Sequence, residues 1–242
     1  MKAIILAAGR GSRMGDLTSK LPKCMTILFK KKLIEWQFLS LNHKAISEIG
    51  IVTGYLKNTF QYKKKYFVNN NWENSNMLSS LLSAKDWLRN NTCIISYSDI
   101  IYEKKIIDQL IKSKGDIVIT YDPNWLNLWK MRFEDPLIDA ENFRIKDNIL
   151  ENIGGKCKKV SSIQGQYMGL IKFTKVGWNK VENFLNNLDQ NEVDKLDITQ
   201  LLKKLLNKGF IINCIAIDGK WLEVDTESDL KNYQLNYDTF HV

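Results

Sequence analysis

Residues Ile4 to Met25 read IILAAGRGSRMGDLTSKLPKCM, and this stretch decides the fold class. An apolar run and two alanines lead into Gly9-Arg10-Gly11-Ser12-Arg13, which predicts a buried strand that breaks into a glycine-containing loop. Glycines at such a position let backbone N–H groups approach a phosphate chain. Arg13 and Lys23 add fixed positive charge, and Pro22 stiffens the backbone just before the lysine. We therefore expect a phosphate-binding loop after the first strand.

The loop matches neither of the two commoner phosphate-binding motifs. A dinucleotide fingerprint beginning at Gly9 needs glycine where Met14 stands, and a P-loop needs Gly-Lys-Ser/Thr where Met14-Gly15-Asp16 stands. Instead, L-A-A-G-x-G-S-R followed by P-K resembles the signature of nucleotidyltransferases that activate sugar phosphates and small polar headgroups. The resemblance implies that Arg13 and Lys23 are catalytic. It also implies a set of nucleotide-binding residues in this stretch: Leu6, Ala7, Ala8, Gly9, Gly11, Ser12, Arg13 and Lys23.

Length and composition are those of a globular protein. The chain has 242 residues, of which 44% are hydrophobic, enough for one α/β domain with a full core, and we expect a single domain over residues 1–242. No apolar run reaches the length of a membrane span, and the sequence begins directly with a strand pattern and not a secretory signal. We therefore expect a cytoplasmic protein without a membrane partner.

Charge and cysteine content exclude several other functions. The net charge of +8 invites a nucleic-acid partner, but the lysine runs are short and lack interleaved aromatic residues, so we expect no nucleic-acid binding and only a general attraction for anionic substrates. Cys24, Cys93, Cys157 and Cys214 have no zinc-site spacing and are expected to be reduced thiols. The two histidines have no catalytic context.

Short β-rich runs alternate with amphipathic stretches in the first half of the chain. This alternation predicts βαβ units and a parallel sheet, and shorter alternating runs after Asp122 predict antiparallel additions. The expected strands are 2–6, 49–53, 92–96, 116–121, 141–145, 149–153, 166–173, 211–217 and 221–224. The expected helices are 33–44, 56–66, 76–89, 103–113, 176–188, 198–207 and 227–237. The family resemblance, which runs from Met1 to about Tyr233, implies a Rossmann-like α/β/α sandwich with a mixed, mainly parallel central sheet, of the nucleotide-diphospho-sugar transferase type. It also implies an acceptor-binding insertion at about residues 122–173.

Two carboxylates stand where metal ligands are expected. Nucleotidyl transfer joins two anionic reactants, so catalysis depends on charge neutralisation and in-line positioning. Asp99 follows the strand pattern that ends at Ser96, and Asp225 ends the phrase W-L-E-V-D. Taken singly, each could be a turn or cap residue. Both resemble the metal-binding aspartates of the family, which implies an Mg²⁺ cofactor, and an oxygen-only site with few protein ligands suits that ion.

The segment Asn74–Ser80 resembles the base-recognition segment of the cytidylyltransferase branch. The resemblance implies that Asn76 and Ser79 read cytosine, because an amide offers both a donor and an acceptor to the pyrimidine edge. Capping of a helix N-terminus by Asn76 is the structural alternative. Gly54 and Tyr55, after the second strand, are expected to line the same nucleotide site, and the nucleotide expected is CTP.

The phrase from Trp125 to Glu141 resembles the acceptor region of cytidylyltransferases that activate phosphonates and phosphorylated amines. The stretch from Ile95 to Phe173 resembles the branch serving capsule phosphoramidate synthesis, which implies L-glutamine phosphate as the acceptor, ahead of phosphocholine and an aminoalkyl phosphonate. Arg132 or Lys156 is expected to bind the acceptor phosphate, and Glu223 to meet an ammonium group. Trp129 and Gln166 complete the expected acceptor set, and composition does not choose among these acceptors.

Three other functions were weighed against this one. A sugar-1-phosphate nucleotidyltransferase would carry a base-recognition glutamine and a G-x-A phrase where Asn76–Ser80 stands. A nicotinamide-dependent oxidoreductase would close its second strand with an acidic residue, but that strand ends Thr53-Gly54-Tyr55. A non-catalytic nucleotide sensor would be expected to have lost an aspartate or Lys23. The sequence leaves the oligomeric state open, and a homo-oligomer is compatible with it.

Overall fold

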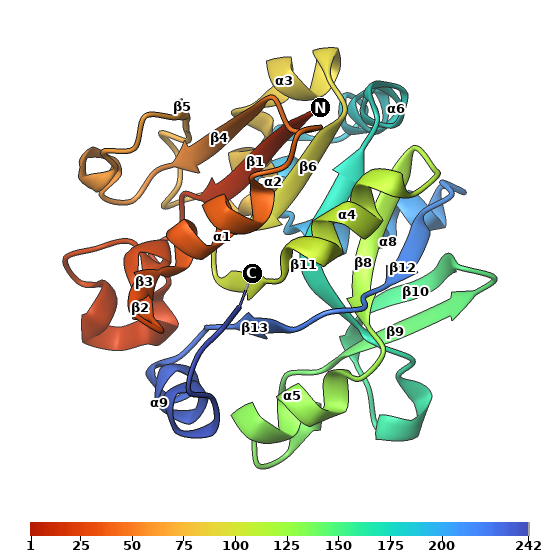
Figure 1. Ribbon diagram of the computed structural model, residues 1–242. Helices are drawn as coiled ribbons and strands as arrows, with labels where there is room; N and C mark the ends of the chain where they lie inside the picture. Colours follow the sequence, from red (N-terminus) through yellow and green to blue (C-terminus); the bar gives the residue numbers. More distant parts are fainter. Residues whose placement is uncertain (242) are drawn as a thin grey trace.

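The first strand lies inside a nine-stranded sheet in the computed structural model, which describes residues 1–241 (Figure 1). The predicted domain 1–242 includes Val242, which lies outside the described residues. In spatial order the strands are β5 (Lys65–Val68), β4 (Glu48–Thr53), β1 (Lys2–Ala7), β6 (Cys93–Tyr97), β11 (Gln166–Phe173), β8 (Ile117–Asp122), β12 (Asn213–Ala216), β10 (Ile149–Lys156) and β9 (Glu141–Lys146). Two small ladders pair β2 (Ile27–Leu28) with β3 (Lys31–Lys32) and β7 (Ile100–Tyr102) with β13 (Trp221–Glu223).

Strand directions confirm the mixed, mainly parallel sheet. β1 runs parallel to β4 and β6, and β12 runs parallel to β8, whereas β11 is antiparallel to both β6 and β8. Ala3, Ile4 and Ile5 of β1 are fully buried, because helices cover both faces of a parallel strand and consecutive apolar side chains can then all be enclosed. The carboxyl ends of β1, β4 and β6 share one edge of the sheet.

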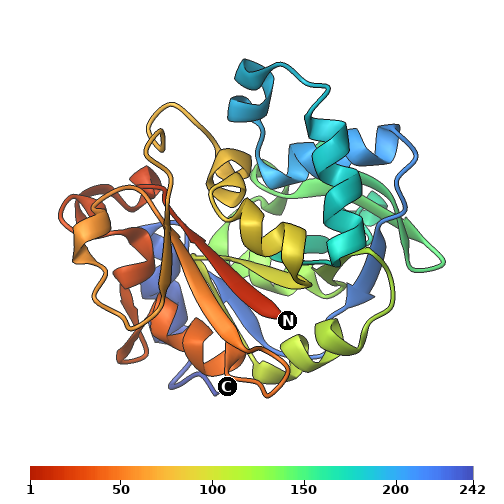
Figure 2. The same ribbon diagram turned by 90° about the horizontal axis from the view of Figure 1, so that it is seen from above.

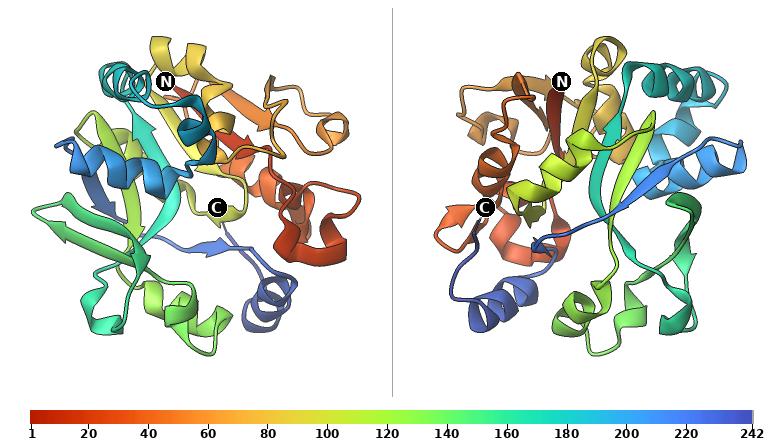
Figure 3. Two further views of the ribbon diagram at one scale, coloured as in Figure 1. Left: turned by 180° about the vertical axis from the view of Figure 1, so that it is seen from behind. Right: turned by 45° about the vertical axis from the view of Figure 1, so that its right-hand side comes forward.

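Helices pack on both faces of the sheet (Figures 1 and 2). α1 and α4 cover the face toward the viewer in Figure 1, and α8 covers the opposite face, which Figure 3 shows from behind. The α-helices are α1 (Leu33–Leu41), α2 (Met77–Leu82), α3 (Lys85–Asn90), α4 (Lys104–Lys112), α5 (Trp125–Arg132), α6 (Lys175–Leu185), α7 (Gln190–Lys195), α8 (Ile198–Asn207) and α9 (Glu227–Asn236). The 3₁₀ turns are η1 (Ser12–Thr18), η2 (Lys23–Met25), η3 (Lys57–Thr59), η4 (Pro136–Ile138) and η5 (Val160–Ser162).

The prediction of a helix over 56–66 was wrong. Leu56 has a left-handed φ of 45°, so only the short turn η3 follows it, and Lys65–Val68 pairs with β4 as an edge strand. The helix expected over 76–89 is divided into α2 and α3, where Ser83 donates its side-chain hydroxyl to the carbonyl of Ser79. Helices α5 and α7 were not predicted. Within residues 1–241, no helix combines the length and apolarity that a membrane span requires.

Candidate active site

The β7–β13 ladder brings the two predicted metal aspartates together. Glu223 pairs with Ile100 in this ladder, and the N–H of Val224 donates to the carbonyl of Asp99 at 2.8 Å. Asp99 and Asp225 are therefore neighbours, although 125 residues lie between them in the chain. Asp225 is buried, whereas the side chain of Asp99 is one-fifth exposed at 20%.

Lys23 bridges the two aspartates. Its Nζ lies 2.8 Å from Oδ2 of Asp99 and also contacts Oδ1 of Asp225, while Arg13 pairs with the other oxygen of Asp225. Burial alone would lower the pKa of Lys23, but the two facing carboxylates outweigh it and hold this pKa above its ordinary value. Burial alone would raise the pKa of Asp99, but Lys23 and Arg13 hold it below its ordinary value. Both groups are thus kept charged.

The loop after β1 reaches this cluster along the same sheet edge. Leu6, Ala7 and Ala8 are buried, whereas Gly9 and Ser12 are exposed. The N–H of Tyr55 donates to the carbonyl of Ala8 at 2.9 Å, and a Cβ on Gly54 would lie 2.8 Å from the same oxygen. Gly54 and Tyr55 therefore contact the loop, and their role at the nucleotide stays a prediction. Arg13, with a side chain 66% exposed, is open to an incoming anion.

The predicted base-reading pair contacts α7. Asn76 caps α2: its Oδ1 accepts the N–H of Met77 at 2.8 Å, and its Nδ2 donates to the carbonyl of Lys195 at 3.2 Å. The hydroxyl of Ser79 donates to Oδ1 of Asp194 at 2.7 Å. The capping role weighed for Asn76 is thus present, and the contact of this pair with a helix far along the chain had no signal in the sequence.

The expected acceptor residues do not all reach one place. Arg132 has no exposed side-chain surface, and its guanidinium binds Glu223 and, at 3.2 Å, Asp229. The role expected for it at the acceptor phosphate does not match this enclosure, because its charge is already neutralised by carboxylates. Gln166 is also enclosed and bonds both the N–H and the carbonyl of Glu141, at 3.0 and 2.6 Å. Lys156 is exposed at the end of β10, opposite Glu141 in the ladder.

The tryptophans of the acceptor phrase belong to the core. Trp125 and Trp129 are 3% and 4% exposed, and their ring centroids lie 5.8 Å apart. The indole N–H of Trp129 donates to Oδ2 of Asp139 at 3.1 Å.

Glu223 remains partly exposed at 24% of its side chain. Burial, together with the charges of Asp99 and Asp225, raises the pKa of Glu223 to about 7, and Arg132 opposes the shift.

The donor set fits a small hard cation. Asp99 and Asp225 supply carboxylate oxygens around Lys23, with Arg13 also at Asp225, and Oδ1 of Asp99 is buried without a hydrogen-bond partner in the described structure. Across residues 1–241, no group of three or more His, Cys, Asp or Glu side chains is placed to hold a metal. A metal here would complete its shell with phosphate oxygens and water, which is the habit of Mg²⁺.

Sequence reasoning missed Asp229, which accepts the N–H groups of Asp225 and Thr226, each at 2.8 Å. The signal was present, because Thr226 and Asp229 have the spacing of a capping box.

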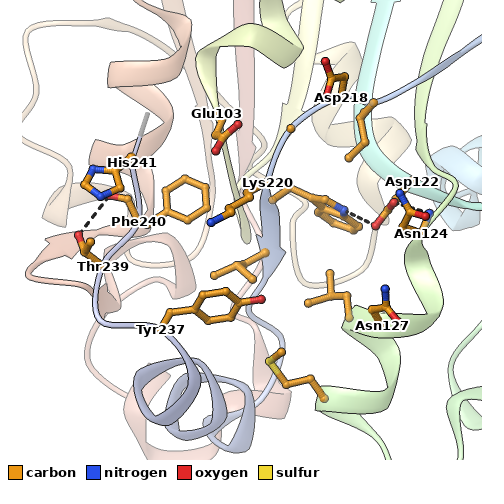
Figure 4. A pocket seen from close by; sticks show the side chains of 16 residues that line it. Glu103, Asp122, Asn124, Asn127, Asp218, Lys220, Tyr237, Thr239, Phe240 and His241 are labelled. Atoms are coloured by element: carbon orange, nitrogen blue, oxygen red, sulfur yellow. Dashed lines mark hydrogen bonds between the residues drawn. The ribbon is translucent and has the colours of Figure 1, made fainter.

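A cavity of about 350 Å³ lies outside the aspartate cluster, between α5, β13 and the C-terminal segment (Figure 4). Lys220, Tyr237 and Phe240 border this cavity, and none of the predicted site residues does.

A strand-ending loop, a bridging lysine and paired aspartates meet at one edge of the sheet. Residues 3–139 match the model of the MobA-like NTP transferase domain, and the chain belongs to this family. It is thus an enzyme of the nucleotidyltransferase class with cytidylyltransferase relatives, as the loop motif indicated. The oxidoreductase alternative is overturned by this family membership.

The relatives extend the comparison beyond the family model. A CTP:phosphoglutamine cytidylyltransferase of Campylobacter jejuni is 35% identical over 248 residues, which cover 96% of this chain and 98% of that protein. A choline-phosphate cytidylyltransferase of Streptococcus pneumoniae is 28% identical over 85% of this chain and 96% of its own. The solved inositol-1-phosphate CTP transferase of T. maritima superposes with a TM-score of 0.74 over 97% of this chain and 94% of its own, at 20% identity, which confirms the fold.

Proposed function

We propose that this enzyme is an Mg²⁺-dependent cytidylyltransferase that transfers CMP from CTP to a small phosphorylated acceptor and releases pyrophosphate. The observation that carries the proposal is the assembly of Arg13, Lys23, Asp99 and Asp225 into one network of ion pairs at the carboxyl edge of the sheet. The 35% identity to a cytidylyltransferase along almost the whole chain supports the choice of CTP.

The reaction needs charge neutralisation and not a nucleophilic side chain. An oxygen of the acceptor phosphate forms a bond to the α-phosphorus of CTP, the bond from that phosphorus to the bridging oxygen breaks, and pyrophosphate takes the electron pair. Arg13 and Lys23 would bind the triphosphate and offset its developing charge. Asp99 and Asp225 would hold Mg²⁺, which when bound supplies a Lewis acid for the phosphate oxygens. The loop of Gly9 and Gly11 would offer backbone N–H groups to the phosphates.

Recognition of the base is assigned to the N-terminal turn of α2. Asn76 and Ser79 carry the donors and acceptors that cytosine requires, and both already bond polar groups of α7. Gly54 and Tyr55 would border the nucleotide from β4. In this arrangement, α7 and the base would compete for the same polar groups, so Asn76 and Ser79 would exchange their bonds to α7 for bonds to cytosine.

For the acceptor we propose L-glutamine phosphate, which would connect the enzyme to capsule phosphoramidate synthesis. Phosphocholine would need several aromatic faces around its trimethylammonium group, but Trp125 and Trp129 are enclosed in the core. Glu223 pairs with Arg132 through Oε2, but its side chain remains 24% exposed beside Asp99 and Asp225, and its other oxygen suits an ammonium group that donates hydrogen bonds. Because the Arg132 side chain has no exposed surface, the acceptor phosphate is assigned to Arg13, whose side chain is 66% exposed, and to the metal, with Lys156 available from β10.

The test is a pyrophosphate-release screen of CTP, UTP, GTP and ATP against glutamine phosphate, phosphocholine, 2-aminoethylphosphonate and a sugar 1-phosphate. We expect turnover with CTP and glutamine phosphate, and none in the presence of excess chelator. Turnover with a sugar 1-phosphate alone would replace the proposal by a sugar nucleotidyltransferase. Equal use of CTP and UTP would remove cytosine from it.

A further inference from the structure

Asp229 is a buried carboxylate beneath Asp225. It is 1% exposed, and it stands at the third position of α9. Its Oδ2 accepts two main-chain N–H groups, those of Asp225 and Thr226, each at 2.8 Å. Oδ2 of Asp229 therefore fixes the main chain that carries the Asp225 carboxylate.

The second oxygen of Asp229 connects this contact to the other half of the site. It accepts from Nε of Arg132 at 3.2 Å, and Nη1 of the same guanidinium binds Glu223. Arg132 comes from α5, whereas Glu223 and Asp229 lie on either side of Asp225 in the chain. One arginine thus ties α5 to both flanks of the metal aspartate.

Helix capping alone does not require this arrangement. Thr226 already caps α9 through its Oγ1, which accepts the N–H of Asp229 at 3.2 Å. At the equivalent position of α8, the uncharged Gln200 completes the capping box of Asp197. Burying a charged carboxylate costs free energy unless it is paired, and such pairs often add nothing to stability. A charged residue at this position is therefore better explained by the bonds that Asp229 makes to Asp225 and Arg132 than by capping of the helix.

We propose that Asp229 is a positioning residue of the active site, which fixes the main chain of Asp225 for metal binding and, through Arg132, sets the position of Glu223. This inference rests on the proposed role of Asp225 as a metal ligand. Residues that hold metal ligands in place typically contribute about 10–100-fold to metal affinity or activity.

The variant to make is Asp229→Asn, which keeps the size of the side chain but lacks the second acceptor oxygen. Binding of Mn²⁺ would be followed by electron paramagnetic resonance in the presence of the α,β-methylene analogue of CTP, which cannot transfer its nucleotidyl group. We expect the Kd for Mn²⁺ to rise by roughly 10-fold or more. We also expect kcat to fall further than KM for CTP rises, because the defect lies at the metal and not at the base.

Thr226→Ala is the matched control, since it removes the hydroxyl cap of the same helix and leaves the bonds of Asp229 to Asp225 and Arg132 in place. It should match Asp229→Asn in the loss of stability to urea but bind Mn²⁺ as the wild type does. If Asp229→Asn does not fold, Arg132→Lys carries the test. A lysine has a single nitrogen and cannot reproduce the separate contacts that Nε and Nη1 of the guanidinium make to Asp229 and Glu223, so this variant should also weaken Mn²⁺ binding. A wild-type Kd in the folded variant, or equal weakening in Thr226→Ala, overturns the inference. Absence of Mn²⁺ binding by the wild type would instead overturn the proposed metal site.

Discussion

Gly11 lies so close to Lys23 that a Cβ on the glycine would come within 2.7 Å of Cβ and Cδ of the lysine. Gly11 also has a left-handed φ of 72°, which side chains other than that of glycine adopt at a cost. Lys23 in turn reaches both Asp99 and Asp225. The missing side chain at Gly11 therefore leaves room for the lysine that holds the two aspartates.

Gly11→Ala should displace Lys23 and lower kcat by on the order of 10²-fold, the scale for loss of a charge-stabilising group. Steady-state kinetics with CTP and the acceptor would measure it. Gly209→Ala is the control for backbone strain, because Gly209 has a φ of 79° with no atom within 4 Å of its would-be Cβ. It should lower the melting temperature without lowering kcat. Equal kcat values for the two variants would contradict the steric explanation.

Asp225→Asn should abolish turnover, because the neutral amide replaces a carboxylate that binds Lys23 and Arg13 and is assigned to the metal. Pyrophosphate release at increasing Mg²⁺ would measure the effect, and circular dichroism would check that the fold is retained. Asp218→Asn, at a carboxylate that is 88% exposed on the preceding loop, should keep wild-type turnover. Full activity of Asp225→Asn would exclude the metal assignment.

Glu141 makes the stability of the protein depend on pH. Burial, with the nearby charges of Asp197 and Asp139, raises the pKa of Glu141 from 4.5 to about 7. Between these values the folded chain binds a proton that the unfolded chain has released. The free energy of unfolding therefore falls as pH rises through this window, by at most ~1.4 kcal/mol per pH unit for one proton.

Urea unfolding at pH 5, 6, 7 and 8 would measure this slope. Glu223, whose pKa is also raised to about 7, contributes in the same window, so Glu141→Gln should reduce the slope without abolishing it. The variant should therefore gain stability relative to the wild type as the pH rises. Glu134→Gln, at an exposed carboxylate before η4, is the matched control and should keep the wild-type slope. An unchanged slope in Glu141→Gln would assign the pH dependence to another group.

The local parts of this fold could be predicted because hydrophobic periodicity dictates them. The fully buried run of β1 and the amphipathic α4 and α8 lie where their patterns indicate. The segment 56–66 could not be predicted in the same way. Tyr66 and Phe67 form a strand because they pair with Ile51 and Val52 of β4, a contact that the local pattern does not contain.

The candidate active site also combines residues that the sequence predicts with contacts that only the fold creates. Asp99 and Asp225 were predicted from their positions after strands and from their resemblance to the metal-binding aspartates of the family, but their proximity depends on the β7–β13 ladder. Arg132 was expected at the acceptor phosphate because the phrase that contains it resembles the acceptor region of cytidylyltransferases. Its actual partners, Glu223 and Asp229, follow almost a hundred residues later, and only the packing of α5 beside α9 brings them to it. Tertiary pairing of charges is invisible to sequence spacing.

The preference for CTP over UTP should depend on Asn76. Removing its amide in Asn76→Ala should lower the ratio of the two kcat/KM values by about tenfold, the equivalent of one well-placed hydrogen bond, and lower the CTP rate less. The measurement is kcat/KM for each nucleotide at saturating acceptor. Asn70→Ala, at an exposed asparagine of the preceding loop, should keep the wild-type ratio. A ratio unchanged by Asn76→Ala would assign base reading to other residues.

The acceptor amine should be recognised by Glu223, the partly exposed carboxylate beside the metal aspartates. In Glu223→Gln the amide oxygen can still accept from Arg132, but the negative charge that faces the ammonium is lost. We expect KM for glutamine phosphate to rise by about tenfold or more, since hydrogen bonds to a charged group are worth ~1.5–3 kcal/mol. The same acceptor without its α-amino group should show no such rise, because it has no ammonium to lose. Glu227→Gln, at a glutamate 55% exposed on α9, should discriminate between the two acceptors as the wild type does. If Glu223→Gln still preferred the amine-bearing acceptor by the wild-type factor, the ammonium would have to lie against another carboxylate, and Asp139 would be the next to substitute.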